Sequence, residues 1–337
     1  MKNPPLISII VPTLNEERYI AQCLDSILEA MYSKEKMEVI VVDGMSQDKT
    51  REIVQEYHKK YSFIYLLENV DSYTPVGMNL GINTSKGEYI FILSAHAQYA
   101  HDYFIKLVEN IEKLNADCVG GVLGTDVKNK NKKSSSIKEI LMHKFGVGNA
   151  SFRTGSNSVK AVDTVAFGCY KRSTFEKYGL FDEKLIRNQD IELNKRIING
   201  GGKIYLMPEV KCTYYARENF ITLAKNNYSN GFWNILTVYY TKTLNSLSLR
   251  HFIPLLFVLS LVVPIVISLV FPKILWIVFF SLVSYLSLVI IISLGLKNNS
   301  NSISYLIISF LTLHFSYGLG SLMGIFSVIN KYIKGEK

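Results

Sequence analysis

Cysteine is scarce in this sequence, which has only four among 337 residues. Cys23, Cys118, Cys169 and Cys212 are widely spaced, with no Cys-x-x-Cys pair and no Cys/His cluster of zinc-binding spacing. A disulfide scaffold and a structural zinc domain are therefore excluded. We interpret the four thiols as reduced side chains of a cytosolic domain.

Charge is almost absent from the C-terminal part of the chain. Between His251 and Asn330 only Lys273 and Lys297 are charged. Crossing a hydrocarbon core of about 30 Å takes roughly 20 apolar residues, and three uncharged stretches reach that length. These stretches are residues 252–271, 274–296 and 303–330. A purely soluble protein is therefore excluded, and residues 251–337 are predicted to form a multi-pass region of about three transmembrane helices with a short basic tail.

Two features leave the topology of these helices open. Pro254 and Pro264 interrupt the first stretch, so it can instead be re-entrant or lie in the membrane interface. Three crossings would also place the basic tail, with Lys331 and Lys334, on the outer side, against the positive-inside tendency.

The remaining sequence lacks the strong basic excess of a nucleic-acid reader. Residues 1–250 have 32 Lys and Arg against 27 Asp and Glu. This mild surplus suits a face resting on anionic lipid. The apolar run at residues 6–14 is short and has no small-residue cleavage site, so it predicts a buried strand rather than a signal peptide, and a cytoplasmic location for this part.

Apolar β-branched runs alternate with helical patterns along the first third of the chain. Strands are predicted at residues 6–12, 37–43, 63–67 and 88–93, and helices at 18–31, 50–60, 76–84 and 102–114. Such alternation predicts a Rossmann-like α/β domain with a parallel sheet, whose ligands lie at the carboxyl ends of the strands. Polar, charged turns follow these strands.

Further along, the pattern is less regular. Residues 126–138, rich in Lys, Asn and Ser, predict a mobile surface loop, and residues 218–250 predict amphipathic helices at the membrane interface. The predicted organisation is a globular domain at 1–217, interface helices at 218–250 and the membrane region at 251–337.

Several ordered motifs together resemble a known family. They are VPTLNEERYI at 11–20, VVDGMSQDKT at 41–50, GMNLGINTSKGEYI at 77–90, SAHAQY at 94–99, the segment 162–193 and SLRHFIPLLFVL at 248–259. The sequence resembles family 2 glycosyltransferases of the GT-A fold, and most closely the succinoglycan-biosynthesis type of bacterial exopolysaccharide glucosyltransferase. This resemblance extends over nearly the whole chain.

The resemblance assigns a nucleotide-sugar site to the first two strand ends and to the fourth. The residues implied are Pro12, Thr13, Asn15, Glu16, Asp43 and Ser94. A plain strand-to-helix cap is the structural alternative for the first loop. Ser94 departs from the pattern, because the family has an Asp at this place.

A divalent metal ion is implied at His96, two residues after Ser94. An imidazole ligand suits Mn²⁺ in preference to Mg²⁺, which favours oxygen octahedra. The alternative is a hydrogen-bonded histidine at a strand end.

Asp190, in the motif Asn-Gln-Asp at 188–190, matches the family's general base, which an inverting displacement needs beside the acceptor hydroxyl. A helix cap is its structural alternative. The acceptor or phosphate side is assigned to Asp182, Glu183, Arg217 and Trp233. Ordinary turn acids remain an alternative for the first two, and a headgroup-level aromatic for Trp233.

The resemblance thus implies an inverting, metal-dependent hexosyltransferase at the bacterial inner membrane. Its expected donor is a UDP-sugar, for which UDP-glucose is the first candidate. Its expected acceptor is an undecaprenyl-diphosphate-linked sugar of exopolysaccharide or capsule biosynthesis. Membrane lipids are expected partners as well, and nucleic acid is not. One alternative is a polyprenyl-monophosphate glycosyltransferase. Another, suggested by Ser94 and the divergent loop at 227–233, is a catalytically weakened scaffold subunit that binds nucleotide-sugar.

Overall fold

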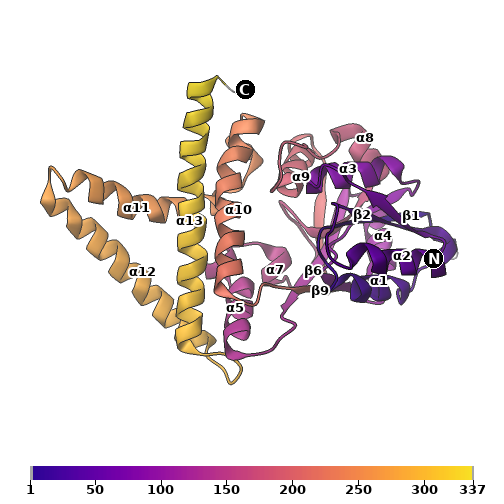
Figure 1. The fold of residues 1–337 in the computed structure, drawn as a ribbon, viewed down its shortest axis with the longest axis horizontal. Coiled ribbons are helices and arrows are strands. Elements are labelled where there is room, and N and C mark those ends of the chain that lie inside the picture. The colour runs from indigo at the N-terminus through magenta and orange to yellow at the C-terminus, as the bar shows by residue number, and fades with distance from the viewer. Residues whose placement is uncertain (1–2, 336–337) are drawn as a thin grey trace. The chain divides into compact units, whose positions relative to one another are not determined.

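The computed structural model describes residues 3–335, which fold into two compact units. The sheet unit comprises the described residues up to Thr125 together with Ala150–Tyr215. The helical unit comprises Asp126–Asn149 and residues 216–335 (Figure 1). The segment between β6 and α7 therefore belongs to the helical unit, although it interrupts the sheet unit in sequence.

The sheet unit is built on a nine-stranded sheet. Its strands are β1 (Ile7–Thr13), β2 (Met37–Asp43), β3 (Ile64–Glu68), β4 (Tyr89–Ile92), β5 (Ala97–Tyr99), β6 (Cys118–Asp126), β7 (Lys160–Ala161), β8 (Ala166–Lys171) and β9 (Ile204–Tyr215). The order is β3-β2-β1-β4-β8-β6-β9-β5, with β7 beside β9. The pairs among β1 to β4 are parallel, and β8 pairs antiparallel with β4. The predicted parallel α/β pattern is confirmed.

Helices cover both faces of this sheet because the strand side chains alternate in direction. Ile9 of β1 joins a core with Leu24 and Leu107, whereas Ile10 joins the opposite core with Met78. The helices are α1 (Ile20–Leu28), α2 (Thr50–Lys60), α3 (Thr74–Thr84), α4 (Tyr103–Lys113), α7 (Ser151–Thr154), α8 (Arg172–Tyr178) and α9 (Gln189–Asn199). The cores on the two faces of the sheet hold the carboxyl ends of β1 and β2 side by side. There Thr13 of β1 is the register partner of Asp43 in β2.

The prediction of a mobile loop at residues 126–138 is wrong for its second half, because residues 132–138 form part of a helix. α5 (Lys132–Met142) begins after Asn131, whose side chain accepts hydrogen bonds from the backbone N–H groups of Lys133 and Ser134, both at 3.0 Å. Ile137 and Ile140 are fully buried against apolar side chains of α13. The Lys-rich composition obscured this helix because its apolar face begins only at Ile137 and is completed by Ile140 and the partly buried Leu141.

The helical unit also contains α6 (Lys144–Val147), α10 (Phe220–Thr241), α11 (Ile253–Ile267), α12 (Leu275–Leu296) and α13 (Ile303–Lys334). α10 runs alongside α13 in Figure 1. Glycines permit this approach: a Cβ added at Gly231 would lie 2.0 Å from the Tyr317 carbonyl oxygen, and one at Gly320 would lie 2.0 Å from that of Tyr228. Gly231 and Gly320 therefore serve the close packing of these two helices.

Two helical stretches among the described residues are long and apolar enough to cross a membrane. They are Pro272–Leu296, with 25 residues, and Ile303–Lys334, with 32 residues. The sequence predicted three such helices. α11 has only 15 residues, which is shorter than the roughly 20 that a bilayer core requires. Pro264 lies inside α11, and the helix ends three residues later.

Candidate active site

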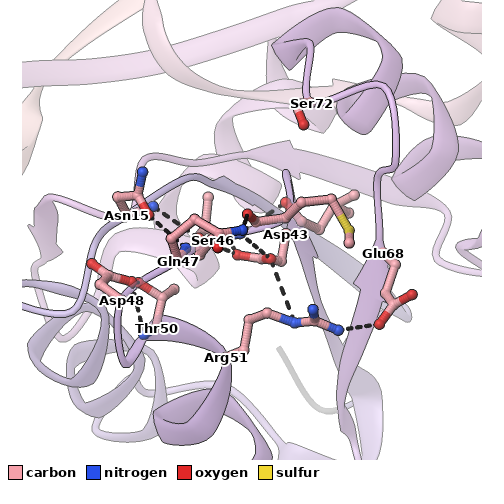
Figure 2. Close-up of polar contacts among 12 residues, drawn as sticks. Asn15, Asp43, Ser46, Gln47, Asp48, Thr50, Arg51, Glu68 and Ser72 are labelled. Carbon is pink, nitrogen blue, oxygen red and sulfur yellow. Dashed lines mark hydrogen bonds and ion pairs between the residues drawn. The ribbon is translucent and has the colours of Figure 1, made fainter.

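Two loops at the carboxyl ends of β1 and β2 hold each other in place. The Asn15 backbone N–H donates to Ser46 Oγ at 2.8 Å, and the Gln47 N–H donates to Asn15 Oδ1 at 2.8 Å (Figure 2). Asn15 has a φ of 56°, in the left-handed region that asparagine tolerates better than most residues. Asn15 thus joins the two loops and does not line the cavity described below.

Asp43, at the end of β2, stabilises the second of these loops through Ser46. Its side chain is fully buried and accepts hydrogen bonds from the Ser46 N–H at 2.9 Å and from Ser46 Oγ at 2.5 Å. Arg51 Nε lies 3.7 Å from the carboxylate, and the Arg51 guanidinium also pairs with Glu68 (Figure 2). Both carboxylate oxygens of Asp43 are therefore engaged by the protein itself.

A cavity of about 400 Å³ lies next to these loops within the sheet unit. The predicted site residues that line it are Pro12, Thr13, Glu16, Ser94, His96 and Asp190. Its other polar lining residues include Asn69, Ser72, Arg153, Gln189 and Tyr214. The fold therefore gathers residues from the first loop, the end of β4 and the start of α9 around one space.

His96 and Glu16 form a close pair on the cavity wall. His96 Nδ1 lies 2.8 Å from Glu16 Oε1, and the two side chains are only 18% and 17% exposed. The Tyr214 ring meets the His96 ring edge-on, with centroids 5.1 Å apart. The imidazole is thus oriented by a carboxylate on one side and an aromatic ring on another.

Asp190 is placed by the start of α9. The preceding cap residue is Asn188, with a left-handed φ of 63°, so Asp190 lies in the first turn and is not itself the cap. Burial raises the pKa of Asp190, while the backbone N–H groups of Ile191 and Asp190 and the charge of Arg153 oppose this rise. A carboxylate with a raised pKa is a better proton acceptor than an ordinary surface aspartate.

Arg153 supplies a positive charge to the same cavity. It belongs to α7, and its Cζ lies 5.3 Å from the ring centre of Tyr214 and 5.5 Å from that of Phe152. Sequence reasoning missed Arg153, because no motif marks it and its site partners are distant in sequence. The Phe-Arg pair at 152–153 is the one local signal, and such pairs are common.

The family model for glycosyl transferase family 2 matches residues 8–179, which include both loops and the His96 strand end. This chain is a family 2 glycosyltransferase. The transferase is 32% identical over 234 residues to the dolichyl N-acetyl-α-D-glucosaminyl phosphate 3-β-D-2,3-diacetamido-2,3-dideoxy-β-D-glucuronosyltransferase of Methanococcus voltae, covering 67% of this chain and 71% of that protein.

Two further likenesses agree with this assignment. The transferase is 25% identical over 217 residues to the succinoglycan biosynthesis protein ExoA of Rhizobium meliloti, which covers 64% of each chain. Its fold resembles the mannosyltransferase PcManGT of Pyrobaculum calidifontis, solved with GDP-Man and Mn²⁺, with a TM-score of 0.57 and 16% identity over 99% of this chain and 89% of that one. The predicted GT-A fold is confirmed.

The protein donors for a metal ion in the transferase are few. No group of three His, Cys, Asp or Glu side chains in residues 3–335 is arranged to hold an ion. His96 and Glu16 provide an imidazole nitrogen and a carboxylate oxygen within 2.8 Å of each other. This pair fits a divalent cation only when substrate phosphates and water supply the remaining ligands, as is common in phosphate-binding sites.

The other predicted residues of the transferase lie elsewhere. Glu183 accepts a hydrogen bond from Asn79 Nδ2 at 2.9 Å and so joins its turn to α3, whereas Asp182 accepts one from the Lys184 N–H at 3.0 Å and stabilises its own turn. Neither lines the cavity. Arg217 and Trp233 belong to the helical unit, where Arg217 is exposed and Trp233 lies on α10.

Proposed function

We propose that this glycosyltransferase transfers a hexose from a UDP-sugar, with inversion, to a polyprenyl-diphosphate-linked acceptor in exopolysaccharide or capsule assembly. The observation that carries the proposal is Asp190. Its carboxylate has a raised pKa and lies on the wall of the cavity that the first loop also lines, through Pro12, Thr13 and Glu16. A single well-placed base is what an inverting displacement requires.

The reaction follows from this placement. Asp190 takes the proton of the acceptor hydroxyl as that oxygen forms a bond to the anomeric carbon of the sugar. The bond from that carbon to the diphosphate oxygen breaks, its electron pair leaves with UDP, and the sugar configuration inverts. His96 and Glu16 together with the donor phosphates would hold a divalent cation, Mn²⁺ in preference to Mg²⁺, which would offset the phosphate charge.

A lipid-linked acceptor is supported from two directions. The chain has two helices that are long and apolar enough to cross a membrane, so a hydrophobic acceptor would share its environment. The Methanococcus relative is named for transfer to a dolichyl phosphate-linked sugar. That name also keeps a polyprenyl-monophosphate-linked acceptor as the second candidate. We place the sheet unit on the cytoplasmic face, where nucleotide-sugars are made.

The test is UDP release by the detergent-purified full chain, given a panel of UDP-sugars and membrane lipid extract, with Mn²⁺ or with a chelator. We expect release from one sugar only, dependent on both the lipid and the metal. Mass spectrometry of the lipid product then distinguishes a diphosphate from a monophosphate acceptor.

Asp190→Asn should lower the turnover number by about 10²- to 10⁴-fold and leave UDP affinity nearly unchanged, because the amide cannot accept the proton. Asp102→Asn is the matched control, since Asp102 lies outside the cavity and pairs with Lys106 at 2.5 Å. UDP binding without release from any donor would instead support a scaffold subunit.

A further inference from the structure

Arg153 lines the cavity, and the described residues leave one of its hydrogen-bond donors unused. Its Nη1 atom is buried and has no hydrogen-bond partner among the described residues. Within residues 3–335 the guanidinium also makes no ion pair with a carboxylate at 4.0 Å or less. Burying a charged donor without a partner is costly, so a site that keeps one is suited to a ligand that completes it.

The surroundings hold the guanidinium without neutralising it. The rings of Tyr214 and Phe152 lie within 5.5 Å of Arg153 Cζ and offer cation–π contacts, which carry no formal charge. Tyr214 also meets the His96 ring at 5.1 Å. One aromatic ring therefore connects Arg153 to the strand end where the donor phosphates are expected.

The carboxylates of the cavity leave Arg153 available. Glu16 is occupied by His96 at 2.8 Å. Asp190 is close enough for the charge of Arg153 to act on its pKa, but no ion pair joins them. Ser94, which lines the cavity just after β4, is uncharged, so it adds no negative charge that would repel a phosphate.

We propose that Arg153 binds the diphosphate of the nucleotide-sugar donor. This inference rests on the proposed function and adds a residue that no sequence motif identified. A guanidinium presents a planar pair of N–H donors that matches phosphate oxygens, and such charge-assisted bonds are the strong ones. The same contact stabilises the departing UDP, whose terminal phosphate oxygen receives the electron pair of the broken bond.

The experiment compares UDP and uridine binding by the full chain in detergent, for the wild type and for Arg153→Gln, Arg153→Lys and Arg18→Gln. We expect Arg153→Gln to weaken UDP binding by about 10- to 100-fold, which corresponds to losing hydrogen bonds to a charged group, with uridine affinity unchanged. Arg153→Lys should recover part of the lost UDP affinity, because lysine restores the positive charge but not the planar pair of N–H donors. Arg18→Gln is the control, because Arg18 is exposed and outside the cavity.

Uridine affinity also reports whether the nucleoside pocket is folded. Equal loss of uridine and UDP binding in both Arg153 variants would assign the residue a structural role and overturn the inference. Unchanged UDP affinity with reduced turnover would overturn it too, since Arg153 would then act only through Asp190. A wild-type chain that binds neither UDP nor uridine contradicts the proposed function itself, and the inference falls with it.

Discussion

At the scale of single residues, the central feature is a carboxyl group whose charge the protein disfavours. Burial raises the pKa of Asp190, so the folded state holds its proton to a higher pH than an unfolded chain, whose aspartates titrate near about 3.9. Catalysis needs the ionised form. Activity should therefore be lost as the pH falls through the raised pKa of Asp190. Arg153→Gln should move this loss of activity to still higher pH, because the charge of Arg153 lowers the pKa of Asp190. A pH profile of kcat/KM measures both.

The same shift has a consequence for stability. A carboxyl group whose pKa is raised on folding contributes stability at low pH that is lost as the pH rises through the folded pKa. At pH 7 Asp190 is therefore a net cost to the folded state, and Asp190→Asn should raise Tm while removing activity. Asp102→Asn should not raise Tm, because Asp102 is a surface acid paired with Lys106. A lower Tm for Asp190→Asn would contradict this account of the site.

At the scale of secondary structure elements, α10 and α13 depend on positions that have no side chain. A Cβ at Gly231 or at Gly320 would fall 2.0 Å from a carbonyl oxygen of the other helix, so alanine there forces the two backbones apart. We expect Gly231→Ala and Gly320→Ala each to lower Tm by several degrees in detergent. Gly295→Ala in α12 is the matched control, because nothing lies within 4 Å of its added Cβ. Equal Tm values for all three variants would show that this packing does not limit stability.

A buried hydrogen-bond chain inside the helical unit holds α6 against the long helices. His314 Nε2 lies 2.9 Å from the Phe145 carbonyl oxygen and therefore donates to it, which leaves Nδ1 to accept from Tyr285 OH at 3.0 Å. This chain links α6 to both long helices. The segment from 126 to 149 is thus held by specific polar contacts as well as by the buried face of α5.

At the scale of the whole molecule, the number of membrane crossings decides on which side the basic C-terminal residues lie. Three crossings would place them on the outer side, against the positive-inside tendency, and two crossings would not. With Pro272–Leu296 and Ile303–Lys334 as the spans, Arg250 and the basic residues Lys331 and Lys334 fall on the same side, as the positive-inside tendency requires. Single cysteines introduced at Ser300 and Ser248 test this in sealed membrane vesicles. We expect an impermeant thiol reagent to label them from opposite sides, with little background because all four native cysteines are buried. Labelling from one side would contradict two spans.

The sequence by itself determined the features that depend on local pattern. Alternating β-branched and helical runs predicted the parallel strands, uncharged stretches predicted long apolar helices, and the Asn-Gln-Asp motif predicted Asp190 at the start of a helix. Each of these signals lies within a few consecutive turns or strands, so neighbouring residues suffice to produce it.

Only the tertiary structure decided which charges meet. Glu16 and His96 are 80 residues apart in sequence, and Arg153 reaches the cavity of Asp190 from a short helix that no periodicity marks. Tertiary contacts also bury Asp43, whose carboxylate accepts a hydrogen bond from Ser46. They stabilise a helix in a lysine-rich segment by burying Ile137 and Ile140. These outcomes depend on contacts between distant segments, whose energies no local pattern contains.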